Sequence, residues 1–251
     1  MPVVVITGAS AGLGEAMALQ LASAADHTVV LIARRKDALD AVAARCTGKG
    51  AAAVTAIVAD VCKRDEVERA VAAVLAAHGT IDVWVNNVGR GCNVLPSALT
   101  DADVSDMMQV NVMSAIYCMQ AVLPHFKARR TGTFVNVSSM LGRIPHISTI
   151  RSAYSASKHF LNGITGSFAA EHAAEYPDIV FALASPGVIG TDFGLTAGSA
   201  DSRTLPGAQD VDECAAAIID GAIRKRQRET YTQPAHKAMM RQHLESLVPA
   251  E

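Results

Sequence analysis

Residues 3–14 read VVVITGASAGLG, and this stretch decides the fold. The apolar run at 3–6 has the length of one buried β-strand, and the small residues behind it predict a tight turn. Gly8, Gly12 and Gly14 fall on that turn, immediately before an Ala-rich stretch typical of a helix. Glycines at such a βα turn let backbone N–H groups approach a pyrophosphate at the helix N-terminus. The stretch therefore predicts a first βα unit that holds a dinucleotide.

The rest of the chain repeats this alternation. β-rich runs at 28–32, 53–58, 81–85, 133–137 and 179–184 are separated by helical stretches, and 229–232 predicts a last short strand. The order predicts an α/β fold: a single doubly wound Rossmann-fold domain over residues 1–251, with a central parallel sheet of about seven strands. The irregular stretch at 186–209 follows a strand end, where ligands of such sheets bind. We expect it to be functional.

The composition excludes several classes of protein. Half of the 251 residues are hydrophobic, only 4% are aromatic and the net charge is −2, so disorder and a nucleic-acid or anionic-membrane surface are not expected. The five cysteines form no CxxC pair, and no metal site is expected. No apolar stretch is long enough to span a bilayer and no signal-peptide pattern opens the chain, so we expect a cytoplasmic protein.

Two arginines, Arg34 and Arg35, follow the second predicted strand. In dinucleotide-binding folds this position meets the adenosine ribose, where an acid selects NAD and an arginine can pair with the 2′-phosphate of NADP. Asp37 falls in the next helix, which makes it a poor ribose ligand. The pattern therefore favours NADP(H) over NAD(H).

A third pattern carries acid–base chemistry. Tyr154 and Lys158 stand at i and i+4, on one face of a predicted helix. A Lys⁺ one turn away favours the phenolate and lowers the pKa of a tyrosine, which suits proton transfer at a carbonyl or an alcohol. Upstream, Ser138 and Ser139 follow the fifth predicted strand, where a serine could donate a hydrogen bond to a substrate oxygen.

Together these residues resemble the short-chain dehydrogenases/reductases in their common cytosolic form of about 250 residues. The resemblance runs from residue 3 to about 232 and includes further pieces in the family's order, namely Asp60-Val61, Asn86-Asn87-Val88-Gly89, Asn111 and the stretch 186–191 (PGVIGT). It implies a tetrad. Tyr154 would pass the proton, Lys158 would bind the nicotinamide ribose and depress the tyrosine pKa, Ser139 would polarise the substrate oxygen, and Asn111 would hold a relay water.

Ser139 is preferred to Ser138 because it stands three residues before a glycine, Gly142, as in the family. For the cofactor the resemblance implies a phosphate loop, arginines on the 2′-phosphate, residues around adenine and its ribose, and contacts to the carboxamide and phosphate. The implied cofactor residues are Gly8, Ser10, Gly12, Leu13, Gly14, Arg34, Arg35, Asp60, Val61, Asn87, Gly89, Tyr154, Lys158, Pro186, Gly187, Val188 and Thr191.

The chain departs from the family pattern in three places. Ser139 and Tyr154 are about two residues further apart than usual, with the extra length at 146–151 beside the expected active site. Ala11 stands where many NADP-preferring relatives carry a basic residue, so the preference would depend on the two arginines. The C-terminal tail, 235–251, is helical and charged in character and replaces the usual ending. The resemblance assigns 186–209 to a substrate lid.

These observations predict an NADP(H)-dependent oxidoreductase that interconverts a carbonyl and a secondary alcohol. Two alternatives stay open: a 3-oxoacyl-carrier reductase, for which Arg129 and Arg130 could contribute a basic carrier surface, and a non-catalytic NADP(H)-sensing regulator. The apolar helix predicted at 110–123 is of the kind that pairs subunits in this family, so a homodimer or homotetramer is expected.

Overall fold

A parallel sheet organises the molecule. The structure is a computed structural model and describes residues 1–24, 26–51 and 53–247. In the part of the chain so described, seven strands form one sheet in the order β3-β2-β1-β4-β5-β6-β7, and every pair of neighbours is parallel. The predicted fold class is confirmed. The strands are β1 (Val3–Thr7), β2 (Thr28–Ala33), β3 (Ala53–Val58), β4 (Val83–Asn86), β5 (Gly132–Val137), β6 (Ile179–Ser185) and β7 (Glu229–Tyr231).

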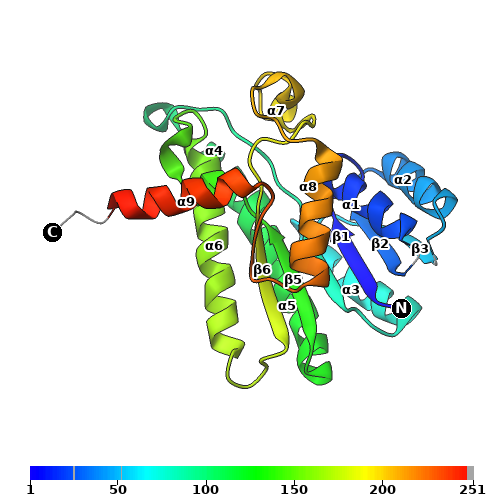
Figure 1. Cartoon of the computed structure of the whole chain (residues 1–251). Coiled ribbons are helices and arrows are strands. Elements are labelled where there is room, and N and C mark those ends of the chain that lie inside the picture. The colour runs from blue at the N-terminus through cyan, green and yellow to red at the C-terminus, as the bar shows by residue number, and fades with distance from the viewer. Residues whose placement is uncertain (25, 52, 248–251) are drawn as a thin grey trace.

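Helices cover both faces of this sheet (Figure 1). One face is covered by α1 (Gly12–Ser23), α2 (Lys36–Gly48) and α8 (Val211–Ile218), and the other by α3 (Arg64–His78), α5 (Ser114–Arg129) and α6 (Ser152–His172). The remaining helices are α4 (Asp101–Met108), the short α7 (Phe193–Thr196) and the C-terminal α9 (Pro234–Leu247). This three-layer arrangement follows from strands that are apolar on both sides.

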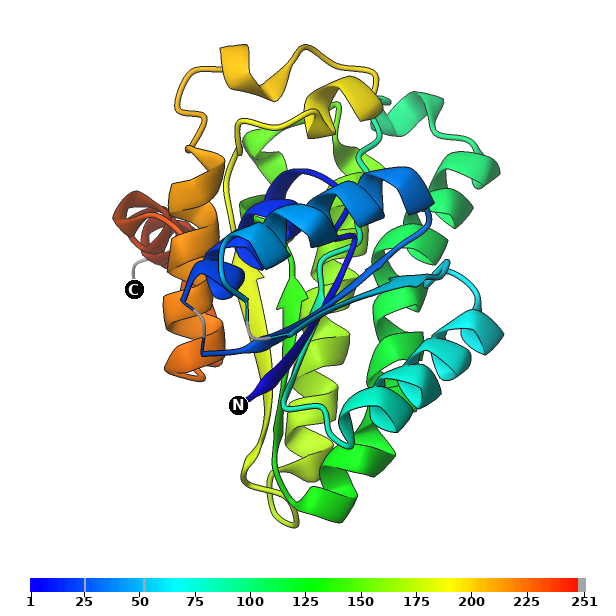
Figure 2. The same cartoon turned by 90° about the vertical axis from the view of Figure 1, so that its right-hand side faces the viewer.

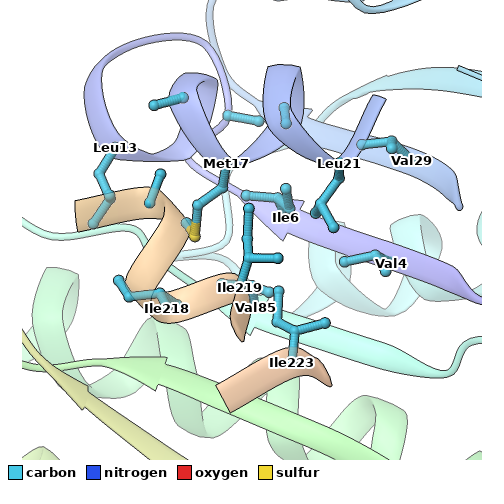
Figure 3. Packing of buried hydrophobic residues seen from close by; sticks show 14 of the residues in the cluster. Val4, Ile6, Leu13, Met17, Leu21, Val29, Val85, Ile218, Ile219 and Ile223 are labelled. Atoms are coloured by element: carbon cyan, nitrogen blue, oxygen red, sulfur yellow. The ribbon is translucent and has the colours of Figure 1, made fainter. Parts of the chain in front are cut away.

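The core between α1 and α8 fixes the start of α1 (Figure 3). Met17 and Leu21 of α1 and Ile218 of α8 are fully buried, and they pack with Ile6 of β1. Truncating one such side chain costs about 2–5 kcal/mol of unfolding free energy. Because this packing holds α1 tightly on the sheet, the N-terminus of α1 stays aligned with the carboxyl end of β1.

The strand order creates a crevice between β1 and β4. The chain runs outward from β1 through β2 to β3, then returns to β4 on the other side of β1 and continues to β7. Loops that leave β1 and β4 therefore part in opposite directions at the carboxyl edge of the sheet, and such a switch point is where doubly wound sheets bind ligands. Figure 2 shows α7 and the segment around it lying over this edge.

Several predicted boundaries need correction. The two helices α4 and α5 are joined by a π-helical turn, Gln109–Met113, and α8 likewise ends in a π-helical turn, Ile219–Arg224. The long helix α6 ends at His172. The strand predicted from residue 81 begins at Val83, the first residue paired in register with β1. Most of the predicted tail forms α9, and 248–251 lie outside the described residues.

Candidate active site

The glycine loop between β1 and α1 has the shape of a phosphate cradle. Gly8 and Gly12 adopt φ values of 66° and 58°, which side chains other than glycine rarely adopt. A Cβ built on Gly14 would lie 2.4 Å from the carbonyl oxygen of Gly8, so only glycine fits where α1 meets the loop. Ala11 precedes α1 and makes no side-chain cap, so the first N–H groups of the helix remain available to an external acceptor. The loop therefore fits a pyrophosphate.

Asn87 ties the loop after β4 to this cradle. Its amide Nδ2 donates to the carbonyl oxygens of Thr7 (3.1 Å) and Gly8 (3.4 Å), and its backbone N–H donates to the Thr7 hydroxyl at 3.0 Å. These bonds close the gap between β1 and β4 and fix the glycine loop. In this structure the Asn87 side chain shapes the cradle through backbone contacts, and its contact with a ribose stays a prediction.

The two arginines after β2 are both exposed on the rim of the cradle. Nη2 of Arg35 donates to the hydroxyl of Ser10 at 3.3 Å, which brings its charge onto the glycine loop. Arg34 lies close enough to Cys62 to lower the pKa of that thiol, against a burial effect that raises it to about 11. Asp60 accepts a 3.0 Å hydrogen bond from the Cys62 N–H, so the turn after β3 faces the same rim as the arginines.

The segment after β6 meets the cradle from the other side. An ideal Cβ on Gly12 would lie 3.6 Å from the methyl carbon of Thr191, so this threonine faces the glycine loop. The carbonyl oxygen of Pro186 accepts from the Met140 N–H at 2.8 Å, and the backbone of Val188 pairs with Gln209. The base of the predicted lid is thus pinned between the loop after β5 and the glycine loop.

Tyr154 lies at the carboxyl edge of the sheet, near the start of α6. Its side chain is 93% buried and packs in a small cluster with Leu141 and Phe193. The Phe193 ring stands edge-on to it, with 5.6 Å between ring centroids. Ser139, directly after β5, hydrogen-bonds the tyrosine side chain. The Lys158 ammonium lies 5.8 Å from the centre of the tyrosine ring.

Burial controls the ionisation of this pair. Burial raises the pKa of Tyr154, while the hydrogen bond from Ser139 and the charge of Arg151 lower it by less. The predicted lowering of the tyrosine pKa by Lys158 is therefore wrong for this state. The buried ammonium of Lys158 donates to the carbonyl oxygen of Val137 at 2.8 Å, and burial lowers the pKa of the lysine to about 8. Desolvation is thus the largest cause of both pKa shifts.

Comparison with known proteins identifies the family. A family model described as short chain dehydrogenase matches residues 2–201. The chain belongs to this family. A dehydrogenase/reductase SDR family protein 7-like of Anopheles gambiae is 37% identical over 249 residues, which is 92% of this chain and 75% of that protein.

Solved short-chain dehydrogenases share the architecture. One from Sphingobium yanoikuyae, in complex with NADPH, is 29% identical with a TM-score of 0.82. The match covers 100% of this chain and 97% of that chain. A 3-ketoacyl-(acyl-carrier-protein) reductase from Brucella melitensis, complexed with NADH, is 27% identical with a TM-score of 0.76, covering 87% and 90%. Both nicotinamide cofactors thus occur among structures similar to this short-chain dehydrogenase.

Asn111 lies in the π-helical turn, and both the oxygen and the nitrogen of its side-chain amide are hydrogen-bonded. Its amide oxygen accepts from the Arg90 N–H at 2.8 Å, and its amide nitrogen donates to the Arg90 carbonyl oxygen (3.0 Å) and to the Ser157 hydroxyl (2.9 Å). A Cβ on Gly89 would lie 3.5 Å from this amide oxygen and 3.4 Å from Nζ of Lys158. The structure therefore places Asn111 beside Lys158, as a brace between the loop after β4 and α6. The relay water stays a prediction.

The four predicted catalytic side chains come together in this short-chain dehydrogenase, and Ser139 rather than Ser138 is hydrogen-bonded to Tyr154. Ser138 instead donates to the amide oxygen of Asn162 at 2.6 Å. Near this site, Ile189 packs against the core cluster that includes α1, and Ile147 is exposed. Arg151, which directly precedes α6 and lies three residues before Tyr154, was not singled out from the sequence.

Two predicted surfaces can be located in the structure. Arg129 pairs with Asp82 at 2.9 Å and Arg130 lies over the Tyr176 ring, both at the amino edge of the sheet and away from Tyr154. One side of α5 is buried in the protein's own core, and subunit pairing through the helix at 110–123 stays a prediction. Among the described residues no helix is long and apolar enough to cross a membrane, and no group of three or more potential metal-ligating side chains forms.

Proposed function

We propose that this chain is an NADP(H)-dependent oxidoreductase that interconverts a carbonyl and a secondary alcohol, with Tyr154 as general acid and base. The observation that supports this proposal most strongly is that Tyr154, Ser139 and Lys158 lie together at the carboxyl edge of the sheet, beside the glycine loop. Membership of the short chain dehydrogenases supports the reaction class.

The chain's own groups divide the work. When bound, the cofactor supplies or accepts the hydride at the substrate carbon. Ser139 donates a hydrogen bond to the substrate oxygen and orients it toward Tyr154. In reduction, Tyr154 gives its phenolic proton to that oxygen, and burial, which holds the pKa of the phenol above its usual value, keeps the proton in place until then. The proton then returns from solvent past Lys158, whose pKa of about 8 lets its ammonium give up and regain a proton near neutral pH.

The NADP preference is proposed from charge at the cradle rim. Arg34 and Arg35 are exposed there, and Arg35 already contacts Ser10 of the glycine loop. A 2′-phosphate would receive charge-assisted hydrogen bonds from these guanidinium groups, whereas a free 2′-hydroxyl would gain little. The NADPH complex of the Sphingobium yanoikuyae enzyme supports this choice, and the NADH complex of the Brucella melitensis enzyme makes it a question for measurement.

The test is turnover. Purified protein is assayed with NADPH or NADH against a panel of ketones and aldehydes, alongside Tyr154→Phe. We expect NADPH-dependent reduction that falls about a thousandfold in the variant, because the proton donor is gone. Absence of turnover on the panel with either cofactor, or full activity in Tyr154→Phe, contradicts the proposal.

The two alternatives separate in the same assay. A 3-oxoacyl-carrier reductase would prefer a carrier-linked β-ketoester to the free ester. The relation to a 3-ketoacyl-carrier reductase favours this class, but Arg129 and Arg130 lie at the wrong edge to receive a carrier. A cofactor-sensing regulator would bind NADPH without turnover and retain a protein partner. The homodimer or homotetramer and the cytoplasmic location stay predictions.

A further inference from the structure

Arg151 occupies a fixed position at the mouth of the site. It directly precedes α6, three residues before Tyr154. Its backbone forms a parallel bridge with Val94, and the neighbouring Ser152 hydroxyl donates to the Val94 carbonyl oxygen at 3.1 Å. The loop that carries the extra length of this chain, 146–151, thus ends in a residue held against the segment after β4.

The Arg151 guanidinium points into the space between that segment and the lid. A Cβ built on Gly91 would lie 2.6 Å from its Nη1 and 3.1 Å from Cε1 of Phe193, so the guanidinium and this ring both cover Gly91. The guanidinium carbon lies 5.7 Å from the centre of the Phe193 ring. Its charge is also near enough to lower the pKa of the Tyr154 hydroxyl. A cation therefore stands within a small molecule's reach of the proposed proton donor.

The nearby charges leave this cation uncompensated. Asp106 pairs with Arg90 at 2.7 Å, and Asp103 accepts from the Thr100 hydroxyl at 2.7 Å. On the lid, the two aspartates nearest to Phe193, at 192 and 201, both pair with Arg203. Within the ranges that the structure describes, Arg151 has no carboxylate partner. A half-buried guanidinium with neither an ion pair nor a hydrogen bond to another side chain keeps its fork of N–H donors open to an anionic ligand.

We infer that the substrate carries a carboxylate, which Arg151 binds while the carbonyl oxygen meets Tyr154 and Ser139. The inference deepens the proposed function and rests on it: the substrate class becomes an oxo acid and the product the corresponding hydroxy acid. A carboxylate matches the planar fork of one guanidinium, whereas a phosphate carries more charge and more acceptor oxygens than one arginine satisfies. Phe193 stands between Arg151 and Tyr154, so a bound substrate would displace this ring.

The test compares each acid with its own methyl ester. The substrates are 2-oxopentanoate, 3-oxopentanoate and 4-oxopentanoate with their methyl esters, which move the charge along the chain while keeping a ketone. We expect at least one acid to exceed its ester about tenfold or more in kcat/KM. Arg151→Met should lower kcat/KM for that acid about thirtyfold through KM, because a charge-assisted pair is lost, and should change the ester less than about threefold.

Two further variants serve as references. Arg151→Lys should retain part of the acid preference, because the charge stays and the fork is lost. Arg69→Met, in α3 and paired with Asp65, should leave both substrates unchanged. If the wild type prefers the ester in all three pairs, or if Arg151→Met weakens acid and ester alike, the inference is overturned and Arg151 merely holds Phe193 in place.

Failure of the proposed function has a different signature. In that case neither acids nor esters nor any other carbonyl compound is reduced with either cofactor. Calorimetric titration of the NADPH-loaded protein with 4-oxopentanoate and with its methyl ester then tests, without turnover, whether Arg151 binds the carboxylate. Tighter binding of the acid that disappears in Arg151→Met supports the inference, and equal or undetectable binding of the two overturns it.

Discussion

The glycine loop and the surroundings of Tyr154 lie at the same edge of the sheet but are built differently. The loop is one continuous stretch of chain between β1 and α1, and its shape depends on backbone angles at Gly8 and Gly12. The Tyr154 site gathers side chains from segments that follow β4, β5 and β6. The loop presents backbone N–H groups to solvent, whereas Tyr154 is 93% buried.

The difference predicts which substitutions should disrupt each site. A cradle of backbone groups fails when a new atom does not fit, and it is insensitive to side-chain chemistry nearby. A site of buried side chains fails when one hydrogen bond or one charge is removed, because desolvation has already shifted the pKa values of Tyr154 and Lys158. Four predictions test these two kinds of failure.

Gly14→Ala should have the largest effect. The added Cβ would meet the Gly8 carbonyl oxygen at 2.4 Å and the Asn87 amide at 2.7 Å, and both belong to the cradle. We expect NADPH affinity to fall about a hundredfold or more, measured by calorimetry, as the loop is forced open. Gly163→Ala in α6 is the matched control. Nothing lies within 4 Å of its Cβ, so it should raise the unfolding free energy by about 0.5–1 kcal/mol and leave NADPH binding unchanged. NADPH affinity unchanged in Gly14→Ala would contradict the cradle.

Ser139→Ala against Ser138→Ala tests the side-chain site. Removing the Ser139 hydroxyl takes away the hydrogen bond to Tyr154 and the proposed contact to substrate, so kcat should fall about a hundredfold. Ser138 bonds Asn162 instead, so its alanine variant should lose about 1 kcal/mol of stability and keep kcat within about threefold. The measurement is steady-state turnover with chemical unfolding in parallel. Equal kcat losses in the two variants would show that the neighbouring serines are not distinguished.

Arg34→Ala should weaken NADPH binding about tenfold and leave NADH binding nearly unchanged, because only the 2′-phosphate would lose a charged partner. Arg35→Ala should act in the same direction and also loosen the loop through Ser10. The ratio of kcat/KM for the two cofactors is the readout, at low and at high salt. An unchanged ratio in both variants would remove the basis for NADP preference.

Lys158 should make stability depend on pH. Its pKa is about 8 in the folded protein and 10.5 as the ordinary value, so between these values the unfolded chain binds more protons than the native one. Stability contributed by this group therefore rises with pH across that window. Relative to Lys158→Met, the wild type should gain about 2 kcal/mol of unfolding free energy between pH 7.5 and 9.5, measured in urea. A constant difference would mean that the lysine is not desolvated.

Much of the fold could be predicted because its signals are local. The alternation of apolar strands and Ala-rich helices gave the strand positions to within about two residues, since each strand is a continuous buried run. The π-helical turn at Gln109–Met113 could not be predicted. Asn111 in this turn is bonded to Arg90 and Ser157, and contacts between segments so far apart leave no local pattern in the sequence.

The candidate site divides in the same way. The spacing of Tyr154 and Lys158 and the glycine pattern are legible in order along the chain, and the structure gathers them with Ser139 and Asn111. The direction of the tyrosine pKa could not be read, because burial outweighs the effect of a neighbouring charge. The role of Arg151 could not be predicted from the sequence, because its lack of a carboxylate partner is visible only in the structure.

The sequence by itself determined the sheet, the glycine loop and the positions proposed for acid–base chemistry, because these depend on hydrophobic period, glycine and residues one turn apart. Only the tertiary structure decided how Tyr154 is buried beneath Phe193, which of two serines bonds it and where Arg151 places its charge. Those properties depend on desolvation and on contacts between segments that meet only when β4, β5 and β6 align at one edge of the sheet.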